Sequence, residues 1–308
     1  MLGKIYKSTG SWYVVKTPAG EIWDCRLKGL FKLDDITSTN PLAVGDDVEF
    51  DPESSADHTG IIAEIYDRRN HINRQSPSHK LQQHIVAANI DQSLLVVTLK
   101  EPRTSQGFID RWLVTCEAYH VPAILLFNKA DLYRPKEEEK FAAWQEMYSS
   151  VGYPLIRMSV KTGEGLDTVR TALHGKISLL SGHSGVGKSS FLNALFPGMN
   201  LKTHEVSGWS GKGIHTTTFA EMFDLPDSGR IIDTPGMREF GLMDISRPEL
   251  AGYFKEMKEY AGKCQFNNCL HTEEPGCEVK RAVEEGRIYP DRYVSYVNIL
   301  ASIESKSY

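Results

Sequence analysis

Residues 182–189 constrain the fold of this chain more than any other stretch. They read Gly-His-Ser-Gly-Val-Gly-Lys-Ser and match the phosphate-binding pattern G-x-x-x-x-G-K-[ST] at every fixed position. An apolar run over 177–180 precedes them and a helix-like run over 190–196 follows, which is the strand–loop–helix context that the pattern requires. Glycines let backbone N–H groups curl around an anion, and the N-terminus of the following helix faces the same phosphates. We therefore expect a nucleotide-binding α/β domain.

Within this loop, the Lys188 amine is expected to reach the β- and γ-phosphates, and the Ser189 hydroxyl is expected to hold Mg²⁺. The expected nucleotide contacts of the stretch are Gly182, His183, Ser184, Gly185, Val186, Gly187, Lys188, Ser189 and Ser190.

Apolar runs and amphipathic segments alternate from about residue 75 onward. The predicted strands are 90–97, 123–127, 155–158 and 177–180, and the predicted helices lie near 107–119, 137–150 and 166–174. Such alternation indicates a parallel sheet with helices on both faces, whose nucleotide loops lie at the carboxyl ends of the strands. We assign residues 73–242 to this domain.

Two of these strand ends predict guanine recognition. The Asp131 carboxylate can accept hydrogen bonds from guanine N1–H and from the exocyclic amine, a pair of donors that adenine lacks. Asn128 can donate toward the base, and the Lys129 stem can lie over its face. A turn after 155–158 could bring backbone N–H groups to guanine O6. The expected base contacts are Asn128, Lys129, Ala130, Asp131, Ser159, Val160 and Lys161. GTP is therefore favoured over ATP.

Two later segments predict Mg²⁺ and γ-phosphate contacts. Asp233 follows the strand-like run 230–232 and suits Mg²⁺, usually through water, while the Gly236 N–H suits the γ-phosphate. Between the phosphate loop and Asp233, the Gly/Ser-rich stretch 207–218 ends in threonines, as a nucleotide-sensing switch requires. We expect Thr217 to bind Mg²⁺, with Thr216 as the alternative. The stretch is also compatible with an ordinary surface loop.

The order of these motifs is unusual. Most GTPases carry the phosphate loop first and the guanine motif last, whereas here residues 128–131 and 159–161 precede Gly182, and Asp233 comes after it. This is a circular permutation, which a compact sheet allows because the termini of a domain usually lie close together.

Residues 1–72 predict a small closed β-barrel of the oligonucleotide-binding (OB) kind. Short β-prone runs over 12–15, 22–25, 47–50 and 61–65 alternate with turn signals. The barrel could contact RNA through exposed aromatic residues and Arg68, Arg69 or Arg74, or it could be a packing module. The residues leave both interpretations open.

Residues 243–308 predict a helical domain with a structural zinc ion. The spacing Cys264-x4-Cys269-x-His271-x5-Cys277 supplies three thiolates and one imidazole, which suits closed tetrahedral Zn²⁺. Helical segments near 247–261, 278–286 and 290–305 are expected to surround this site. Because the domain is so small, it needs the metal ion to stabilise its fold. Free thiols beside a surface histidine are the alternative.

Composition sets outer limits on the class of protein. No apolar run approaches the ~18 residues that a membrane span needs, and the N-terminus carries no secretory signal. The formal charge of −5 argues against polyanion binding through overall charge, although it leaves a local RNA-binding face possible. We expect a cytoplasmic monomer.

The permuted motif order, combined with the Cys3His spacing, resembles the RsgA (YjeQ) family of bacterial GTPases that depend on the small ribosomal subunit. The resemblance covers barrel, permuted GTPase domain and zinc domain. It implies binding to the small (30S) subunit late in its maturation, rRNA contacts through the barrel and zinc domain, subunit-stimulated GTP hydrolysis, and release. It also assigns catalysis to His215, because Met237 stands where many GTPases carry a water-orienting Gln. Ile214 departs from the basic residue that often precedes this histidine.

Two other functions remain compatible with the residues. One is a GTP-operated switch that acts on a non-ribosomal client. The other is a zinc-stabilised RNA-binding module with a vestigial nucleotide site, against which the intact Lys188, Ser189, Asp233 and Asp131 argue.

Overall fold

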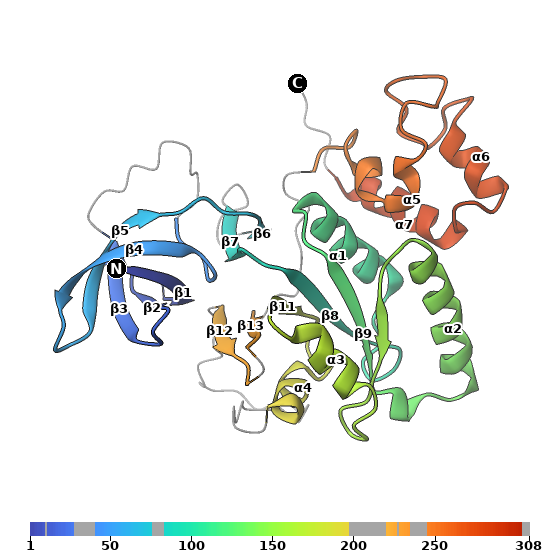
Figure 1. Cartoon of the computed structure of the whole chain (residues 1–308). Helices are drawn as coiled ribbons and strands as arrows, with labels where there is room; N and C mark the ends of the chain where they lie inside the picture. Colours follow the sequence, from blue (N-terminus) through green and yellow to red (C-terminus); the bar gives the residue numbers. More distant parts are fainter. Residues whose placement is uncertain are drawn as a thin grey trace, which may run out of the picture.

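The computed structural model describes residues 1–9, 11–27, 41–75, 83–196, 220–226, 228–234 and 245–303. These residues form an N-terminal barrel, a central sheet flanked by helices, and a C-terminal helical unit (Figure 1). Within these ranges, no helix has the length and apolar character that crossing a membrane requires.

The N-terminal barrel is built from strands β1 (Leu2–Ser8), β2 (Tyr13–Lys16), β3 (Ile22–Leu27), β4 (Asp47–Ser54) and β5 (Thr59–Ile65). Their order is β1-β2-β3-β5-β4, and β4 pairs back with β1 to close the barrel. The predicted closed barrel is confirmed. Sequence reasoning missed β1, because its inward-facing positions include Gly3 and Ser8 beside Ile5 and so lack apolar alternation. The barrel core consists of Ile5, Tyr13, Val15, Trp23, Cys25, Leu42, Val48, Phe50 and Ile62.

A hairpin connects the barrel to the central sheet. Strands β6 (His71–Gln75) and β7 (Gln83–Ala88) pair antiparallel, and β7 leads into β8 (Gln92–Thr98), which is buried throughout. Sequence reasoning did not predict this hairpin.

The central sheet has the order β10 (Leu155–Arg157), β9 (Ala123–Asn128), β8, β11 (Ile177–Ser181), β13 (Arg230–Asp233) and β12 (Glu221–Asp224). The first five strands are parallel, as predicted, so their carboxyl ends meet at one edge. Strand β12 pairs antiparallel to β13 and was not predicted from the sequence. It is short and only partly buried, so it carries little apolar signal.

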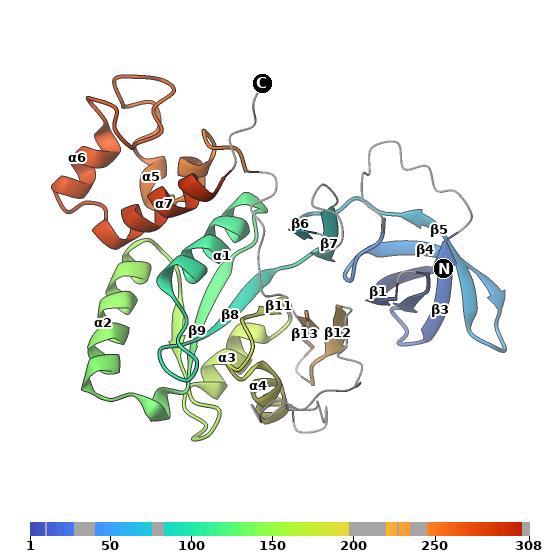
Figure 2. The same ribbon diagram turned by 180° about the vertical axis from the view of Figure 1, so that it is seen from behind.

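Helices cover both faces of this sheet (Figures 1 and 2). Helices α1 (Gln106–Ala118) and α2 (Pro135–Ser150) contribute to one hydrophobic cluster, and α3 (Leu166–Leu173) and α4 (Lys188–Leu195) contribute to the other. Cys116 lies fully buried in the first cluster. A short 3-10 turn, η1 (Ala130–Leu132), follows β9.

The barrel contacts the central sheet through its first strand. Lys7 of β1 pairs with Glu221 of β12 across the strands, and their side chains form a 3.0 Å ion pair. The Tyr6 hydroxyl donates to Asp224 at 2.6 Å. The barrel therefore contacts β12, and β12 pairs with β13, the strand that ends at Asp233.

The C-terminal unit contains η3 (Leu250–Tyr253), α5 (Lys255–Lys258), α6 (Glu278–Glu284) and α7 (Pro290–Ser302). The helix predicted near 247–261 is instead two short pieces, because Phe254 has an extended backbone that separates them while its ring is buried. Helix α7 packs against α1 (Figure 1). The buried Arg292 of α7 binds Asp110 of α1 and Glu256 of α5.

Candidate nucleotide site and metal centre

The phosphate-binding loop sits at the carboxyl end of β11, between that strand and α4. Gly182 and Gly187 have φ angles of 140° and 98°, in the region that disfavours side chains. A Cβ on Gly182 would lie 2.5 Å from the Val96 carbonyl oxygen, and one on Gly187 would lie 2.7 Å from Asn128 Nδ2. The fixed glycines of the motif are thus required by the close approach of the β8 backbone and of the Asn128 side chain at the end of β9.

Asn128, at the end of β9, joins the expected nucleotide loops to one another. Its amide nitrogen donates to the Val186 carbonyl at 2.8 Å, and its amide oxygen accepts the Val160 N–H at 3.2 Å. The side chain is nearly fully buried. The Asn128 amide thus links the phosphate loop to the 159–161 turn.

Asp131 lies beside the second predicted guanine segment. The Ser159 hydroxyl donates to Asp131 Oδ1 at 2.6 Å, and the Lys161 amine lies 3.9 Å from Oδ2. Ala130 is buried and its N–H donates to the Met158 carbonyl at 3.1 Å. Lys129 has a positive φ of 63°, and its amine donates to the Glu101 carbonyl. Segments 128–131 and 159–161 therefore form one connected group of residues.

Lys188 and Asp233 form the polar centre of the site. The Lys188 amine donates to the Gly182 carbonyl and, at 3.2 Å, to the His183 carbonyl. Burial lowers the pKa of Lys188, and burial also raises the pKa of Asp233, although the Lys188 charge opposes that rise. Asp233 Oδ1 is buried and accepts no hydrogen bond from the described residues. A buried carboxylate oxygen without a donor fits a cation.

Thr104, which sequence reasoning missed, anchors the phosphate loop from the far side. Its hydroxyl lies 2.7 Å from His183 Nε2 and accepts the Thr98 N–H at 3.1 Å. The His183 ring also meets Phe108 edge-on, with centroids 5.6 Å apart. The only available signal was position, because residues 99–105 follow β8 at the same sheet edge as the other loops.

Several predicted residues lie outside the described part of the chain. They are the switch residues His215, Thr216 and Thr217 together with Gly236. Ser189 and Ser190 stand in the first turn of α4, at the end that faces the loop.

The structure brings the four predicted metal ligands together. The ligand atoms of Cys264, Cys269, His271 and Cys277 all lie within 4.8 Å of one another. His271 Nδ1 is 3.5 Å from Cys264 Sγ and 3.4 Å from Cys277 Sγ. Burial lowers the pKa of His271, which favours the neutral imidazole that binds metals. This Cys3His cluster suggests a metal site in the C-terminal unit.

Hydrogen bonds fix the backbone of this Cys3His cluster. The Glu274 carboxylate accepts the N–H groups of Leu270 and Thr272, each at 2.8 Å. The hydroxyls of Tyr293 and Tyr296, both on α7, donate to the carbonyls of His271 and Leu270, each at 2.7 Å. The cluster is thereby tied to α7, the helix that packs against α1.

Comparison with known proteins agrees with this architecture. Residues 65–243 match the RsgA GTPase family and residues 2–62 match the RsgA N-terminal domain. The chain is 48% identical over 308 residues to the small ribosomal subunit biogenesis GTPase RsgA of Bacteroides fragilis, covering 100% of this chain and 99% of that protein. It is 49% identical over 305 residues to the RsgA of Christiangramia forsetii, covering 99% and 97% of the two chains.

Solved structures give the same result. The crystal structure of YjeQ from Thermotoga maritima matches with a TM-score of 0.78 and 35% identity, covering 98% of this chain and 97% of that one. The structure of YloQ, a circularly permuted GTPase, matches with a TM-score of 0.75 and 30% identity, covering 100% and 96%. Together with the motif order and the loops that meet at the sheet edge, these matches show that the chain belongs to the RsgA family of circularly permuted GTPases.

Proposed function

We propose that this GTPase binds the small ribosomal subunit and assists its late maturation, hydrolyses GTP to GDP and phosphate under stimulation by the subunit, and then dissociates. The observation that carries the proposal is the set of loops joined through Asn128 at the carboxyl edge of the sheet, with Lys188 and Asp233 at its centre. The name of the Bacteroides fragilis relative, a small ribosomal subunit biogenesis GTPase, supplies the expected partner.

GTP would lie along this edge, with its base at Asp131 and its phosphates at Lys188. Asp131 would accept the two guanine donors in addition to the Ser159 hydroxyl that it already binds. The Lys188 amine, held over the loop by two carbonyls, would turn to the β- and γ-phosphates. Gly236, outside the described residues, would donate to the γ-phosphate.

Mg²⁺ would enter with GTP and be held by Ser189, Asp233 and Thr217, with Thr216 as the alternative. The buried Asp233 Oδ1, which lacks a donor among the described residues, supports this assignment. The ion would neutralise charge on the phosphates during hydrolysis.

The Cys3His cluster would hold one structural Zn²⁺. Three sulfurs and one imidazole suit tetrahedral zinc, and no position remains for a substrate. Because the unit of residues 243–308 is small, zinc would supply much of its folding free energy.

The barrel (1–72) and the zinc domain (243–308) would contact ribosomal RNA on either side of the GTPase domain (73–242). Both units contact that domain directly. The barrel does so through the Lys7–Glu221 ion pair, and the zinc unit does so through the Arg292–Asp110 ion pair. Docking of both units on the ribosomal subunit would therefore affect the central domain. The protein would act as a monomer in the cytoplasm.

His215 would position the attacking water when the small subunit is bound. His215→Ala should then lower subunit-stimulated hydrolysis by ~10²–10⁴-fold, the usual range for such a group, while GTP affinity and subunit binding stay near the wild-type values. His204→Ala, three residues before the Gly/Ser-rich stretch 207–218, is the control. Loss of stimulation in the His204 variant with retention in the His215 variant would show that the wrong histidine was assigned.

The decisive experiment measures the GTP hydrolysis rate with and without purified small ribosomal subunits, with large subunits as the control. We expect stimulation by small subunits only. A rate that small subunits leave unchanged points to a non-ribosomal client, and absence of any hydrolysis points to a vestigial site.

A further inference from the structure

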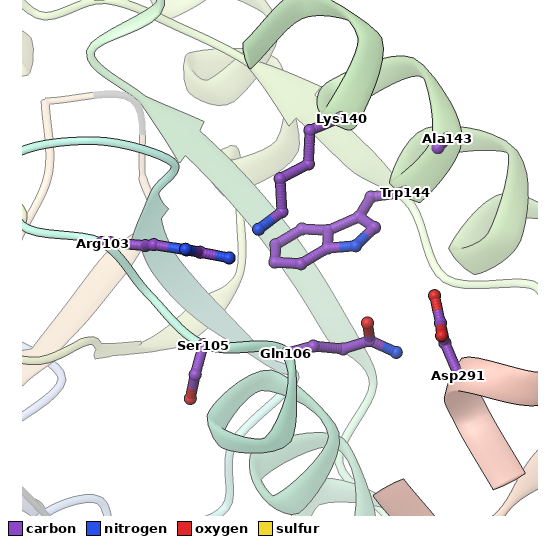
Figure 3. A pocket seen from close by; sticks show the side chains of 7 residues that line it. All are labelled: Arg103, Ser105, Gln106, Lys140, Ala143, Trp144 and Asp291. Atoms are coloured by element: carbon purple, nitrogen blue, oxygen red, sulfur yellow. The ribbon is translucent and has the colours of Figure 1, made fainter. Parts of the chain in front are cut away.

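A cavity separate from the phosphate loop lies on the side of the sheet covered by α1 and α2. It has a volume of about 500 Å³ and is lined by Arg103, Ser105, Gln106, Lys140, Ala143, Trp144 and Asp291 (Figure 3). The lining comes from the segment before α1, from the first residue of α1, from α2 and from the first turn of α7. Its size suits a small ligand.

One end of this cavity is positively charged. Arg103 and Lys140 extend toward each other there (Figure 3), and within the described ranges neither forms an ion pair with a carboxylate. The pKa of Lys140 is lowered chiefly by burial and further by the positive charges of Arg103 and Lys136. No anion within the part of the chain that the structure describes offsets these effects. The N-terminus of the 13-residue helix α1 opens on the same cavity and has no acidic residue in its first turn. Phosphate groups bind to such an arrangement of cations and helix N-terminus.

The other end of the cavity carries uncharged hydrogen-bonding groups and one carboxylate. Trp144 is only 6% exposed, and its indole N–H donates to no acceptor in the described part of the chain. Figure 3 places the indole nitrogen on the side of the ring toward Gln106 and Asp291. Gln106 uses its amide nitrogen toward Asp110 at 3.4 Å, which leaves its oxygen to accept. This end therefore suits hydroxyl and amine groups, whereas a second phosphate would be repelled by Asp291.

The cavity is connected to the phosphate loop through a short segment. Arg103 lies between Pro102, whose ring would lie 3.3 Å from a Cβ on Gly185, and Thr104, whose hydroxyl is 2.7 Å from His183 Nε2. An anion bound by Arg103 would thus be held next to residues that contact the GTP site.

We propose that this cavity binds one nucleotide unit, with its phosphate between Arg103 and Lys140 at the N-terminus of α1. Gln106 and Asp291 would accept hydrogen bonds from its sugar hydroxyls or base amine. The unit would belong to a single-stranded segment of RNA or to a free mononucleotide. The RNA source rests on the proposed ribosomal partner, whereas the site itself rests on the cavity.

The test uses the full chain with GDP filling the phosphate loop, and a fluorescent single-stranded adenylate RNA hexamer as the probe. The double variant Arg103→Gln, Lys140→Gln should bind the hexamer about tenfold more weakly, a loss that corresponds to about one charged hydrogen bond. Its plot of log affinity against log salt should also flatten by roughly 0.7 for each phosphate that the variant no longer neutralises. Lys136→Gln is the matched control, since Lys136 contributes to the local field but does not line the cavity.

Equal hexamer binding by the wild type and the double variant would overturn the proposal, and so would an equal loss in the Lys136 control. If the double variant also loses GDP binding, Trp144→Phe decides, because it keeps an aromatic ring beside Lys140 and removes the indole N–H that would donate to the ligand. Weaker hexamer binding supports the site, and unchanged binding refutes it.

Competition with adenosine monophosphate identifies the source of the phosphate. Displacement of the hexamer at similar concentrations indicates a free nucleotide, and failure to displace indicates a strand. This binding assay uses neither ribosomal subunits nor GTP hydrolysis. Its result can therefore be interpreted even if the proposed ribosomal function proves wrong.

Discussion

The buried ion cluster between α1 and the C-terminal unit gives the sharpest prediction on stability. The side chains of Arg292 and Asp110 are 0% exposed and that of Glu256 is 9% exposed. Arg292 Nε lies 2.7 Å from Glu256 Oε1, and Nη2 lies 3.2 Å from Oε2. Asp110 also binds the Tyr148 hydroxyl at 2.8 Å. Arg292→Met would leave both carboxylates buried without their cation, which costs about 3–5 kcal/mol in such settings.

Hydrogen exchange of the α7 backbone amides is the appropriate assay, because it reports local opening in a chain with several folding units. At about 1.4 kcal/mol for each factor of ten, the loss corresponds to exchange roughly 10²–10⁴-fold faster. Adding Asp110→Asn to Arg292→Met should recover part of the loss, because the amide removes one uncompensated charge. GTP affinity should stay near the wild-type value, since none of these residues contacts the phosphate loop.

Arg281→Met is the control for this prediction. Arg281 pairs with Glu278 and Glu285, but its side chain is 60% exposed, so the change should cost less than about 1 kcal/mol. A loss of stability in Arg292→Met no larger than that in Arg281→Met would contradict this role of the buried cluster, and so would a further loss of exchange protection when Asp110→Asn is added.

Three further predictions concern the nucleotide site and the metal centre. Asp131→Asn should weaken GTP binding by roughly tenfold or more and admit xanthosine triphosphate, whose base presents an acceptor where guanine has its amine; an unchanged preference in competition binding would disprove guanine recognition by Asp131. Protein purified without chelator should contain one zinc ion per chain by elemental analysis, and Cys277→Ser should release it and increase exchange over residues 243–308 while GTP binding survives; absence of stoichiometric metal would refute this. Thr104→Val should lower the free energy of unfolding by about 1–3 kcal/mol and weaken GTP binding, because the Thr98 N–H and the His183 ring both lose their hydrogen-bond partner. Thr104→Ser should keep both hydrogen bonds, and equal GTP affinity in the two variants would contradict the anchoring role of Thr104.

The sequence alone predicted the features that depend on residues close together in the chain. The phosphate loop is determined by eight consecutive residues whose glycines permit one backbone path, and the Cys3His cluster by ligands within one short stretch. The parallel sheet followed from strands such as β8 and β11, which are buried along their whole length and contain the apolar runs 94–97 and 179–180. The motif order then indicated the permutation, because it does not depend on three-dimensional contacts.

Only the tertiary structure decided the features that depend on partners distant in sequence. Strands β1 and β12 have weak patterns of their own and exist because they pair with each other and with neighbouring strands. Thr104 became part of the site only when the ends of β8 and β11 met, and Arg292 gained its role from Asp110, 182 positions earlier. A threonine in a loop and an arginine on a helix are ordinary in sequence, since the charge or donor that each one meets is fixed by packing and not by its neighbours in the chain.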